Sequence, residues 1–443
     1  MQVSGGARGA KTLAGDVNPS FDSLPFPSVF IAASANRLLF LRCRGAGAHH
    51  LFDGMPETRT DRKQKEADAE DHISALPDAI LEQVLSLLPA HEAVRSCVLS
   101  RRWRVLWKSV TNLRITDAGS WSSAAKFNRF VNFMLLLRPA WSLREVELCT
   151  FPAQHARPFP FVHTKEPVRY VEEWIGHAVV CDVQMLRVLV SPTTEPLRLV
   201  AVPLISRYLT TLQLQCVELD DDALDFSSCP VLEDLKVSLC IISAQRMSSH
   251  SLKHLCVAEC SIASDFRTRI STPGLVSLRL SVQCWRAPLL ESMPLLVTAY
   301  VKISPLLLDH RWFGYHGDST SDNPDGSGKC VLLSGLINAT HLELEAADGV
   351  HIFKLDLACC PIFNKLKTLL VNEWVVGRDF CALLCFLQHT PVLEKLIILL
   401  HEDQKPMMNM GESHLQSLRL KTVEFRCTNV DESGSHLFKD ADS

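Results

Sequence analysis

The chain has 443 residues, of which 47% are hydrophobic and 21% charged, so it can bury a sizeable core in two or three domains. Its formal net charge is −4 at pH 7. A protein that holds nucleic acid through phosphate contacts usually carries a basic excess, so no nucleic acid partner is expected. The sixteen cysteines are scattered without a repeated spacing, which predicts reduced thiols in a protein of the cytoplasm, the nucleus or both.

The N-terminal part differs in composition from the rest. Residues 1–52 are rich in glycine, alanine and serine, and residues 60–71 form a charged run with no branched or aromatic apolar side chain. Such sequence supplies few core positions, so residues 1–70 are predicted to be a disordered extension. The apolar stretch 29–41 is interrupted by an Asn-Arg pair. It is also too short to cross a bilayer, so no membrane partner is expected.

A small helical module is predicted next. Apolar residues recur at three- and four-residue steps between residues 73 and 88, which is the period of a helix. Pro77 suits a first helical turn, and Pro89 closes the segment because the residue before a proline avoids the helical region. Two further helices are expected over residues 90–99 and 100–110. Three short helices have little core of their own, so their apolar stripe predicts a partner surface.

A fourth helix is expected in the neck that comes after this module, residues 117–140. The neck would connect the helical module to the next domain of the chain. Its apolar residues have the spacing that places them on one buried face of a helix. These residues are Phe127, Phe130, Val131, Met134, Leu135 and Leu137.

From residue 141 onward the sequence repeats the pattern Leu-x-x-Leu-x-Leu or a close variant. Neighbouring copies begin mostly 20 to 27 residues apart. That spacing is typical of leucine-rich repeats, whose period is about 20–29 residues. Two wider gaps, after the first copy and after the seventh, leave room for a degenerate repeat or an insertion. The copies begin at Leu143, Val183, Leu209, Leu232, Leu252, Leu275, Leu296, Ala339, Leu366, Leu393 and Leu415.

The repeat pattern predicts which side chains are buried. The last two apolar residues of each copy alternate along a strand and point inward, and the residues between them point outward. No copy can bury its own leucines, so the copies are expected to stack into a curved α/β solenoid over residues 141–412. Cys240 and Cys260 occupy the turn position of their copies. The polar stretch 317–328 is expected to be an inserted loop.

The outward positions of the middle strands are the expected place for a target protein. Their side chains are mixed and small, without an aromatic cluster or a strong charge stripe. Most polar positions on a strand are ordinary solvated ones, so the set marks a region rather than a defined site. The target-binding candidates are Gln213, Lys236, His254, Arg279 and Glu343.

Histidine and cysteine, which are zinc ligands, gather at His250, His254, Cys256 and Cys260. The repeat frame separates them, because His254 and Cys256 point outward whereas Cys260 takes the inward turn position. Four ligands cannot easily converge from such positions, so no metal is expected there. The other closely spaced cysteines are predicted to pack in helices and turns. They are Cys359, Cys360, Cys381 and Cys385.

The sequence contains no recognisable enzyme motif. It has no Gly-x-Ser-x-Gly and no Gly-x-Gly-x-x-Gly after a strand. His91-Glu92 lacks the second histidine of a zinc-protease helix, and Gly328-Lys329 is followed by Cys330 rather than by the Ser or Thr of a phosphate-binding loop. We therefore expect no catalytic residue, no cofactor and no metal.

The helical module resembles the F-box domain of plant proteins. Residues 71–81 match the opening of that domain, and residues 84–95 continue the match. The most specific part is Leu-Ser-Arg-Arg-Trp-Arg-x-Leu-Trp at residues 99–107, and the F-box would span residues 71–116. The sequence beyond this module is similar to the plant family that joins an F-box to divergent leucine-rich repeats and an FBD segment. Residues 413–443 resemble only the start of an FBD, with a frayed tail after it.

The resemblance implies a non-catalytic subunit of a ubiquitin ligase. F-boxes of this family dock on a Skp-type adaptor, which links them to a cullin and a RING subunit, while the repeats hold a target. Catalysis would be by proximity, with the chemistry done on another subunit. Val94 and Leu106 would serve the core of the module. By motif position, the adaptor surface would contain Leu76, Pro77, Ile80, Leu81, Val84, Leu88, Val98, Leu99, Trp103 and Trp107.

Two other functions stay open. A leucine-rich-repeat scaffold that lacks ligase coupling would be expected to have a damaged F-box surface, whereas Leu76, Pro77, Trp103 and Trp107 are intact. A hydrolase or metal enzyme hidden in the repeats would need histidine, cysteine and carboxylate groups that converge in one pocket. The sequence does not reveal the identity of the target or any need for a small-molecule co-ligand.

Overall fold

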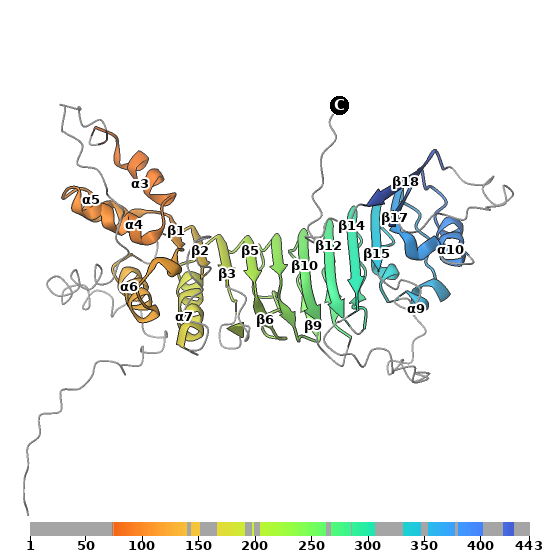
Figure 1. The fold of residues 1–443 in the computed structure, drawn as a ribbon, viewed down its shortest axis with the longest axis horizontal. Coiled ribbons are helices and arrows are strands. Elements are labelled where there is room, and N and C mark those ends of the chain that lie inside the picture. Colours follow the sequence, from red (N-terminus) through yellow and green to blue (C-terminus); the bar gives the residue numbers. More distant parts are fainter. Residues whose placement is uncertain are drawn as a thin grey trace, which may run out of the picture. The chain divides into compact units, whose positions relative to one another are not determined.

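The computed structural model describes residues 73, 75–139, 143–150, 166–190, 197–198, 204–262, 267–284, 286–305, 331–346, 353–376, 380–401 and 420–428. The predicted extension 1–70 and the predicted loop 317–328 lie outside the described residues, as does most of the segment 413–443. Figure 1 shows the described elements, from the helices α3 to α5 to the last strand, β18.

Short helices make up the module that resembles an F-box. They are α3 (Asp78–Ser86), α4 (Ala90–Arg95), the 3-10 helix η2 (Ser96–Val98) and α5 (Trp103–Ser109). Pro77 and Pro89 immediately precede α3 and α4, where a fixed φ and a missing N–H are tolerated. The buried side chains include Val94 and Leu106, which confirms their predicted place in the core. The others are Leu81, Leu85, Ala90, His91, Ala93, Trp103 and Trp107.

The second and third predicted helices are shorter than expected. The second ends at Arg95, and the chain then tightens into the 3-10 turn η2. The Ser96 hydroxyl donates a hydrogen bond to the Ala93 carbonyl oxygen at 2.7 Å, which competes with the helical pattern of the backbone. The third helix begins at Trp103 rather than at Ser100. This break between helices leaves Val98 and Leu99 on a turn.

One long parallel sheet runs through the rest of the described chain. Its main path has twelve strands in chain order, and each strand pairs in parallel with the next. The strands are β1 (Asn112–Ile115), β2 (Glu145–Cys149), β3 (Met185–Leu189), β5 (Thr211–Gln215), β7 (Asp234–Ser238), β10 (His254–Ile262), β12 (Ser277–Cys284), β14 (Thr298–Ser304), β15 (His341–Ala346), β16 (Thr368–Asn372), β17 (Lys395–His401) and β18 (Thr422–Thr428).

Shorter strands lie between these. β4 (Leu197–Arg198), β6 (Val217–Leu219) and β8 (Ile241–Ile242) extend the long sheet beside β10. β9 (Arg246–Ser248), β11 (Arg269–Ser271) and β13 (Leu289–Leu290) form a second, three-stranded parallel sheet. The sequence pattern predicted one strand per repeat, so these additional strands were not anticipated.

Several other connections between described strands contain helices. They are η3 (Ala118–Ser120), α6 (Ala124–Leu136), α7 (Glu166–Val180), η7 (Leu333–Leu336), α9 (Lys354–Ala358), η8 (Glu373–Val376) and α10 (Cys381–His389). The first wide gap in the repeat spacing holds α7, so this gap contains an α-helix that the leucine pattern did not reveal. No helix of the described residues is both long enough and apolar enough to cross a membrane.

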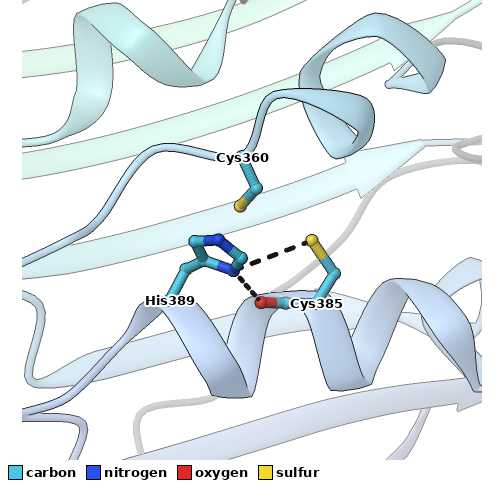
Figure 2. A group of neighbouring side chains, drawn as sticks. All are labelled: Cys360, Cys385 and His389. Carbon is cyan, nitrogen blue, oxygen red and sulfur yellow. Dashed lines mark hydrogen bonds between the residues drawn. The ribbon is translucent and has the colours of Figure 1, made fainter.

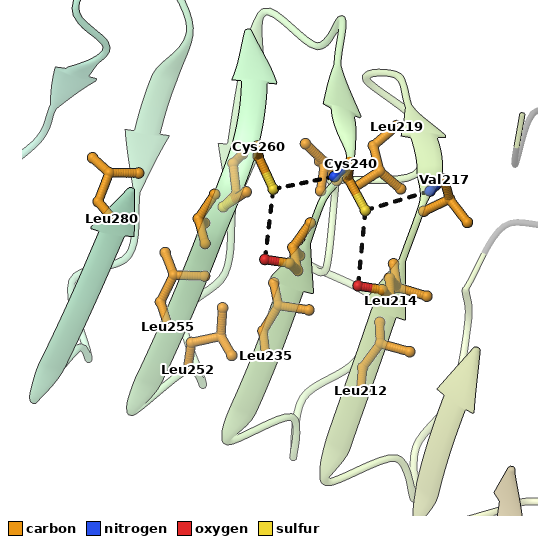
Figure 3. Packing of buried hydrophobic residues seen from close by; sticks show 14 of the residues in the cluster. Leu212, Leu214, Val217, Leu219, Leu235, Cys240, Leu252, Leu255, Cys260 and Leu280 are labelled. Carbon is orange, nitrogen blue, oxygen red and sulfur yellow. Dashed lines mark hydrogen bonds between the residues drawn. The ribbon is translucent and has the colours of Figure 1, made fainter. Parts of the chain in front are cut away.

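The repeated leucines lie in register on neighbouring strands. Leu212, Leu235, Leu255 and Leu278 are aligned from β5 to β12 and are buried on the inner side of the sheet, where Figure 3 shows the first three. Their polar neighbours in sequence are more exposed, as the alternation predicts. The expected fold class is confirmed: a small helical module precedes an α/β leucine-rich-repeat solenoid.

Cys240 and Cys260 occupy the buried turn positions that the pattern predicted. The Cys240 sulfur accepts a hydrogen bond from the Val217 N–H at 3.5 Å, and the Cys260 sulfur accepts one from the Cys240 N–H at 3.4 Å (Figure 3). The Cys260 thiol also lies 3.6 Å from the Val237 carbonyl oxygen, to which it donates. The two sulfurs therefore provide partners for buried backbone groups where the chain turns.

The sheet begins earlier than predicted. β1 lies inside the segment assigned to the F-box, and its Leu113 and Ile115 alternate inward like the leucines of later strands. The predicted neck helix is α6, which lies between the first two strands rather than ahead of the sheet. Its N-terminus is capped by the Ser123 hydroxyl, which accepts from the Lys126 N–H at 3.3 Å. Its buried face contains Phe127, Phe130, Val131, Met134 and Leu135, and Leu137 is partly buried.

Candidate functional site

Large apolar side chains are exposed on the F-box helices. Val98 is 75% exposed, Leu99 66% and Ile80 41%, and Leu76 and Val84 are also exposed. These residues come from α3, its N-terminal flank and the turn at η2. A small module that leaves several large apolar residues in water has a surface suited to a protein partner. Pro77 is exposed as well, and Leu88 is half-buried.

Three of the predicted adaptor-binding residues do not belong to this surface. Leu81 is 1% exposed, Trp103 7% and Trp107 3%, so the core of the F-box already uses all three. The prediction placed them at the adaptor by motif position, which does not distinguish a side chain that faces a partner from one that faces the core. The exposed apolar surface therefore contains only part of the predicted set, and adaptor binding by these residues stays a prediction.

Three exposed apolar residues were missed by the motif. They are Ile73, Leu87 and Val105. Leu87 and Val105 each adjoin a residue that is at least partly buried, Leu88 and Leu106. Adjacent residues can both be buried, as Leu106 and Trp107 are, so sequence spacing alone does not single out Leu87 and Val105 as exposed.

An ion pair holds the start of α3 close to the start of α5. The Arg102 guanidinium lies 2.5 Å from the Asp78 carboxylate and also donates to the Leu76 carbonyl oxygen at 2.5 Å. These contacts connect residues 24 and 26 positions apart in the sequence. Arg102 therefore positions the backbone of Leu76 beside the η2–α5 segment, although the ion pair itself is largely exposed and contributes little net stability.

Two arginines connect the F-box helices to the segments after them. The buried Arg138 guanidinium, just beyond the end of α6, donates to the Trp107 carbonyl oxygen at 2.5 Å and to the Val110 carbonyl oxygen. Both acceptors lie at the C-terminal end of α5, where a cation complements the helix dipole. Burial lowers the pKa of Arg138 to about 10, which still leaves it charged at neutral pH. Arg114 of β1 donates to the Leu87 carbonyl oxygen at 2.8 Å.

The outward residues of the middle strands form rows across the sheet. Gln213, Lys236, Arg279 and Glu343 share one row, in which the remaining positions between Gln213 and Glu343 are Cys256 and Tyr300. His254, the fifth predicted residue, lies in the neighbouring row with Asp234 and Ser277. We call the row from Gln213 to Glu343 the outward row. The structure therefore brings four of the five predicted target-binding residues into line.

Tyr300 is the member of the outward row that the sequence analysis missed. The Arg279 guanidinium lies over its ring, 4.2 Å from the ring centroid, in a cation–π contact. Burial and the nearby Glu345 raise the pKa of both Tyr300 and Glu343. Tyr300 stands between Ala299 and Val301, which point inward, so the alternation rule would have placed it outward had it been applied there.

Comparison with known proteins agrees with this architecture. The F-box domain model matches residues 73–115, which end with β1. The F-box/FBD/LRR-repeat protein At5g22660 of Arabidopsis thaliana is 30% identical over 395 residues, covering 82% of this chain and 83% of the relative. The chain belongs to the plant F-box/FBD/LRR-repeat family. The first strand of the sheet therefore falls within the F-box match of this family member.

Two further relatives show how far the likeness extends. The MEIOTIC F-BOX protein MOF of Oryza sativa subsp. japonica is 28% identical over 359 residues, covering 74% of this chain and 70% of the relative. A putative F-box/FBD/LRR-repeat protein of Arabidopsis thaliana, At2g05300, is 33% identical over 223 residues. That match covers 47% of this chain and 49% of the relative, so it spans about half of each.

Metal-ligand side chains meet at a place where the sequence predicted only packing. His254 is exposed and Cys260 is fully buried, so the set that was weighed as a zinc site stays separated. Among the described residues, the ligand atoms of Cys360, Cys385 and His389 all lie within 4.8 Å of one another. Cys385 and His389 are four residues apart on α10, and this spacing within one helix was the available signal.

One open cavity of about 680 Å³ lies among the turns that precede strands β15 to β18. Two of its lysines already have partners: Lys421 lies 2.8 Å from the Glu394 carboxylate, and Lys365 donates to the Asn338 side chain at 3.0 Å. The basic lining favours an anionic group over a cation. The lining residues are Thr340, Asn364, Lys365, Lys367, Val392, Glu394 and Lys421.

Proposed function

We propose that this chain is the substrate-recognition subunit of a Skp–cullin–F-box ubiquitin ligase. The observation that carries the proposal is the set of exposed apolar residues on a domain that matches the F-box: Leu76, Ile80, Val84, Val98 and Leu99. An F-box match implies a Skp-type adaptor as partner, and through it a cullin and a RING subunit. In the family the F-box/LRR chain is generally a non-catalytic adaptor, and the proposed role is non-catalytic as well.

The proposed mechanism is proximity. The F-box would bind the adaptor while the repeats bind a target protein, which raises the local concentration of the target beside the catalytic subunits. Supporting this arrangement, the F-box and the first strands are held together by Arg114 and Arg138. The role would place the protein in the cytoplasm, the nucleus or both.

The outward row is the proposed target-binding surface. Arg279, Tyr300 and Glu343 support it, because they combine an arginine, an aromatic ring and a half-buried carboxylate on adjacent strands. Arginine and tyrosine are among the residues most often found at the energetic centre of protein interfaces. Gln213 and Lys236 extend the row, and His254 lies beside it.

A binding titration tests the adaptor assignment. The full-length chain is titrated with a plant Skp-type adaptor by calorimetry, beside the double variant Ile80→Asp/Leu99→Asp. We expect the double variant to lose about 100-fold or more in affinity, because two apolar anchors would be replaced by charges that must be desolvated. Both side chains are exposed, so circular dichroism of the variant should match the wild type.

The matched control is Ile205→Asp, which places the same charge at another exposed apolar residue, 58% exposed, in the repeat region. This control should bind the adaptor like the wild type. Absence of binding by the folded wild-type chain would sink the ligase assignment. The chain would then be a leucine-rich-repeat scaffold without ligase coupling, which is the alternative function.

A further inference from the structure

Cys360, Cys385 and His389 form a compact group on the helical side of the last repeats. Figure 2 shows the three side chains turned toward one another, two from α10 and Cys360 from the loop after α9. One ligand atom from each residue lies within 4.8 Å of the other two. All three are partly buried, so the group is sheltered but open to a small ion.

The backbone around the group holds the two segments together. The Phe363 N–H donates to the His389 carbonyl oxygen at 2.8 Å, which joins the loop after Cys360 to the end of α10. Without a metal, the Cys385 thiol donates to the Leu357 carbonyl oxygen of α9 at 3.6 Å, a hydrogen bond that is lost when metal binding removes the S–H proton. Phe386, which follows Cys385 on α10, packs its ring against Trp374 of η8. The three side chains therefore converge on a supported framework rather than on a free loop.

We propose that Cys360, Cys385 and His389 bind a thiophilic divalent metal ion of the zinc class. Zinc takes thiolate sulfur at about 2.3 Å and imidazole nitrogen at about 2.0–2.1 Å in a tetrahedron. Those bond lengths require about 3.8 Å between two sulfurs and about 3.6 Å between sulfur and nitrogen. The observed spacing, at most 4.8 Å between one ligand atom of each residue, exceeds these values by about 1 Å.

The imidazole is oriented by a second contact. His389 Nδ1 lies 2.7 Å from the Cys385 carbonyl oxygen. A metal-binding histidine commonly uses one ring nitrogen as ligand while the other donates to a carbonyl or carboxylate. With its proton on Nδ1, His389 would present the lone pair of Nε2 to the metal. The helix that supplies the Cys385 ligand thus also supplies the group that fixes the His389 ring.

Metal binding would release protons from the two thiols. Each thiol loses its S–H proton to solvent as its sulfur becomes a metal-bound thiolate, and the neutral imidazole contributes a lone pair without losing a proton. Two protons are therefore released for each ion that binds to the protonated thiols. Three protein ligands leave a fourth position for water or another donor, as in an open rather than a closed zinc site.

The bound ion would join two consecutive repeats. Cys360 precedes β16, whereas α10 lies between β16 and β17. Repeat arrays are held together by contacts between neighbouring repeats, so a link at this point stabilises the C-terminal end of the array. This inference is independent of the proposed ligase role, and it replaces the expectation of simple packing for Cys360 and Cys385.

Metal uptake by the full-length chain tests the proposal. The reduced chain, stripped with a chelator, is titrated with Zn²⁺ against a chromophoric chelator and separately with Co²⁺, whose visible absorption reports thiolate ligands in a tetrahedral site. We expect one ion per chain, an increase in Tm, and slower alkylation of Cys360 and Cys385 in the metal-bound form. Cys385→Ser and His389→Gln should each lower the affinity at least about tenfold.

The matched control is Cys381→Ser, one turn earlier on α10, where the thiol is exposed. It should bind the metal like the wild type, and circular dichroism should show all variants folded. Using two ligand variants keeps the test valid if either one misfolds. The proposal is overturned if the folded, reduced chain takes up no metal, or if uptake persists in both ligand variants. It is also overturned if Cys360 and Cys385 only form a disulfide on oxidation. Adaptor binding is scored separately, so the two proposals can fail independently.

Discussion

The F-box module and the repeat sheet differ in how many of their large apolar side chains are exposed. In the sheet the leucines at the repeat positions, such as Leu212 and Leu235, are buried in register against their neighbours, and the outward row is mostly polar. In the helical module Ile80, Val98 and Leu99 are exposed although they are as apolar as those leucines. In the sheet, other residues of the chain bury the leucines. In the helical module part of the apolar surface stays exposed, as expected of a region that binds another protein.

The two regions also differ in whether a family motif covers them. The exposed residues of the F-box belong to a motif that matches a domain family over residues 73–115. The outward row belongs to no such motif, and its mixed composition can change without disturbing the buried leucines, because alternate residues of a strand face opposite sides. The proposed adaptor surface lies within the family motif, whereas the proposed target surface lies outside it.

Trp107→Ala should give the largest loss of stability of the variants considered, and it tests whether this ring belongs to the core of the helical module. The ring is buried, so its loss should cost about 3–5 kcal/mol in the stability of the F-box. Adaptor binding should then fail because the module unfolds, with a matching loss of helical signal in circular dichroism. Retained stability together with lost binding would place the Trp107 ring at the adaptor after all.

Leu235→Ala tests the sheet side. The side chain is buried between the aligned Leu212 and Leu255, so truncation should cost about 2–5 kcal/mol by urea unfolding. The adjacent Lys236→Ala removes an exposed outward side chain and should change stability by less than about 0.5 kcal/mol. Equal effects of the two substitutions would contradict the inward and outward assignment of β7.

Arg138→Met tests the joint between the two regions. Removing the guanidinium leaves the Trp107 and Val110 carbonyl oxygens without this buried donor, which should cost about 1–3 kcal/mol. Hydrogen exchange should become faster at the end of α5 before it does so in the middle of the sheet. The exposed Arg207→Met is the control and should leave both measurements unchanged.

The pH dependence should give the smallest effect. Burial lowers the pKa of His91, which packs edge-on to Trp121, below its usual 6.5. Below pH 6.5 the unfolded chain therefore binds more protons than the folded chain, so stability falls as the pH drops from about 7 to 5. His177 contributes in the same direction, because burial and then Arg138 lower its pKa.

His91→Gln should make that fall in stability shallower when urea midpoints are compared between pH 7 and 5. His254→Gln, at an exposed position on β10, should leave the slope as it is in the wild type. An unchanged slope in the His91 variant would assign the acid sensitivity to other groups, with His177 as the first to test.

The inward faces of the strands could be predicted from the sequence, because the spacing of the leucines indicates which side chains of each strand are buried. The pattern located Leu212, Leu235 and the other inward residues, and it predicted the turn cysteines Cys240 and Cys260. It missed β1, although Val110, Leu113 and Ile115 have the same spacing as the later copies, because that segment was assigned to the helical module. It also missed α7, which lies in a region without the repeat.

The exposed apolar surface of the F-box helices was predicted only in part. A motif records which residue types are required, and both core and surface positions can be required, so Trp103 and Trp107 could not be told apart from Leu99. The group of Cys360, Cys385 and His389 depends on how a loop folds back on a later helix. Such a contact between segments 25 residues apart is set by tertiary packing, which local periodicity does not encode.

The anchoring of α5 by Arg138 has a consequence for the proposed ligase. A buried guanidinium that holds two carbonyl oxygens resists bending at the point where the helices meet the sheet. If the F-box binds an adaptor and the outward row binds a target, as proposed, the span between the two would be close to constant. Ubiquitin would be delivered to whichever target lysine falls within a narrow zone of space, so position on the target surface, rather than the sequence around the lysine, would decide which lysine is modified.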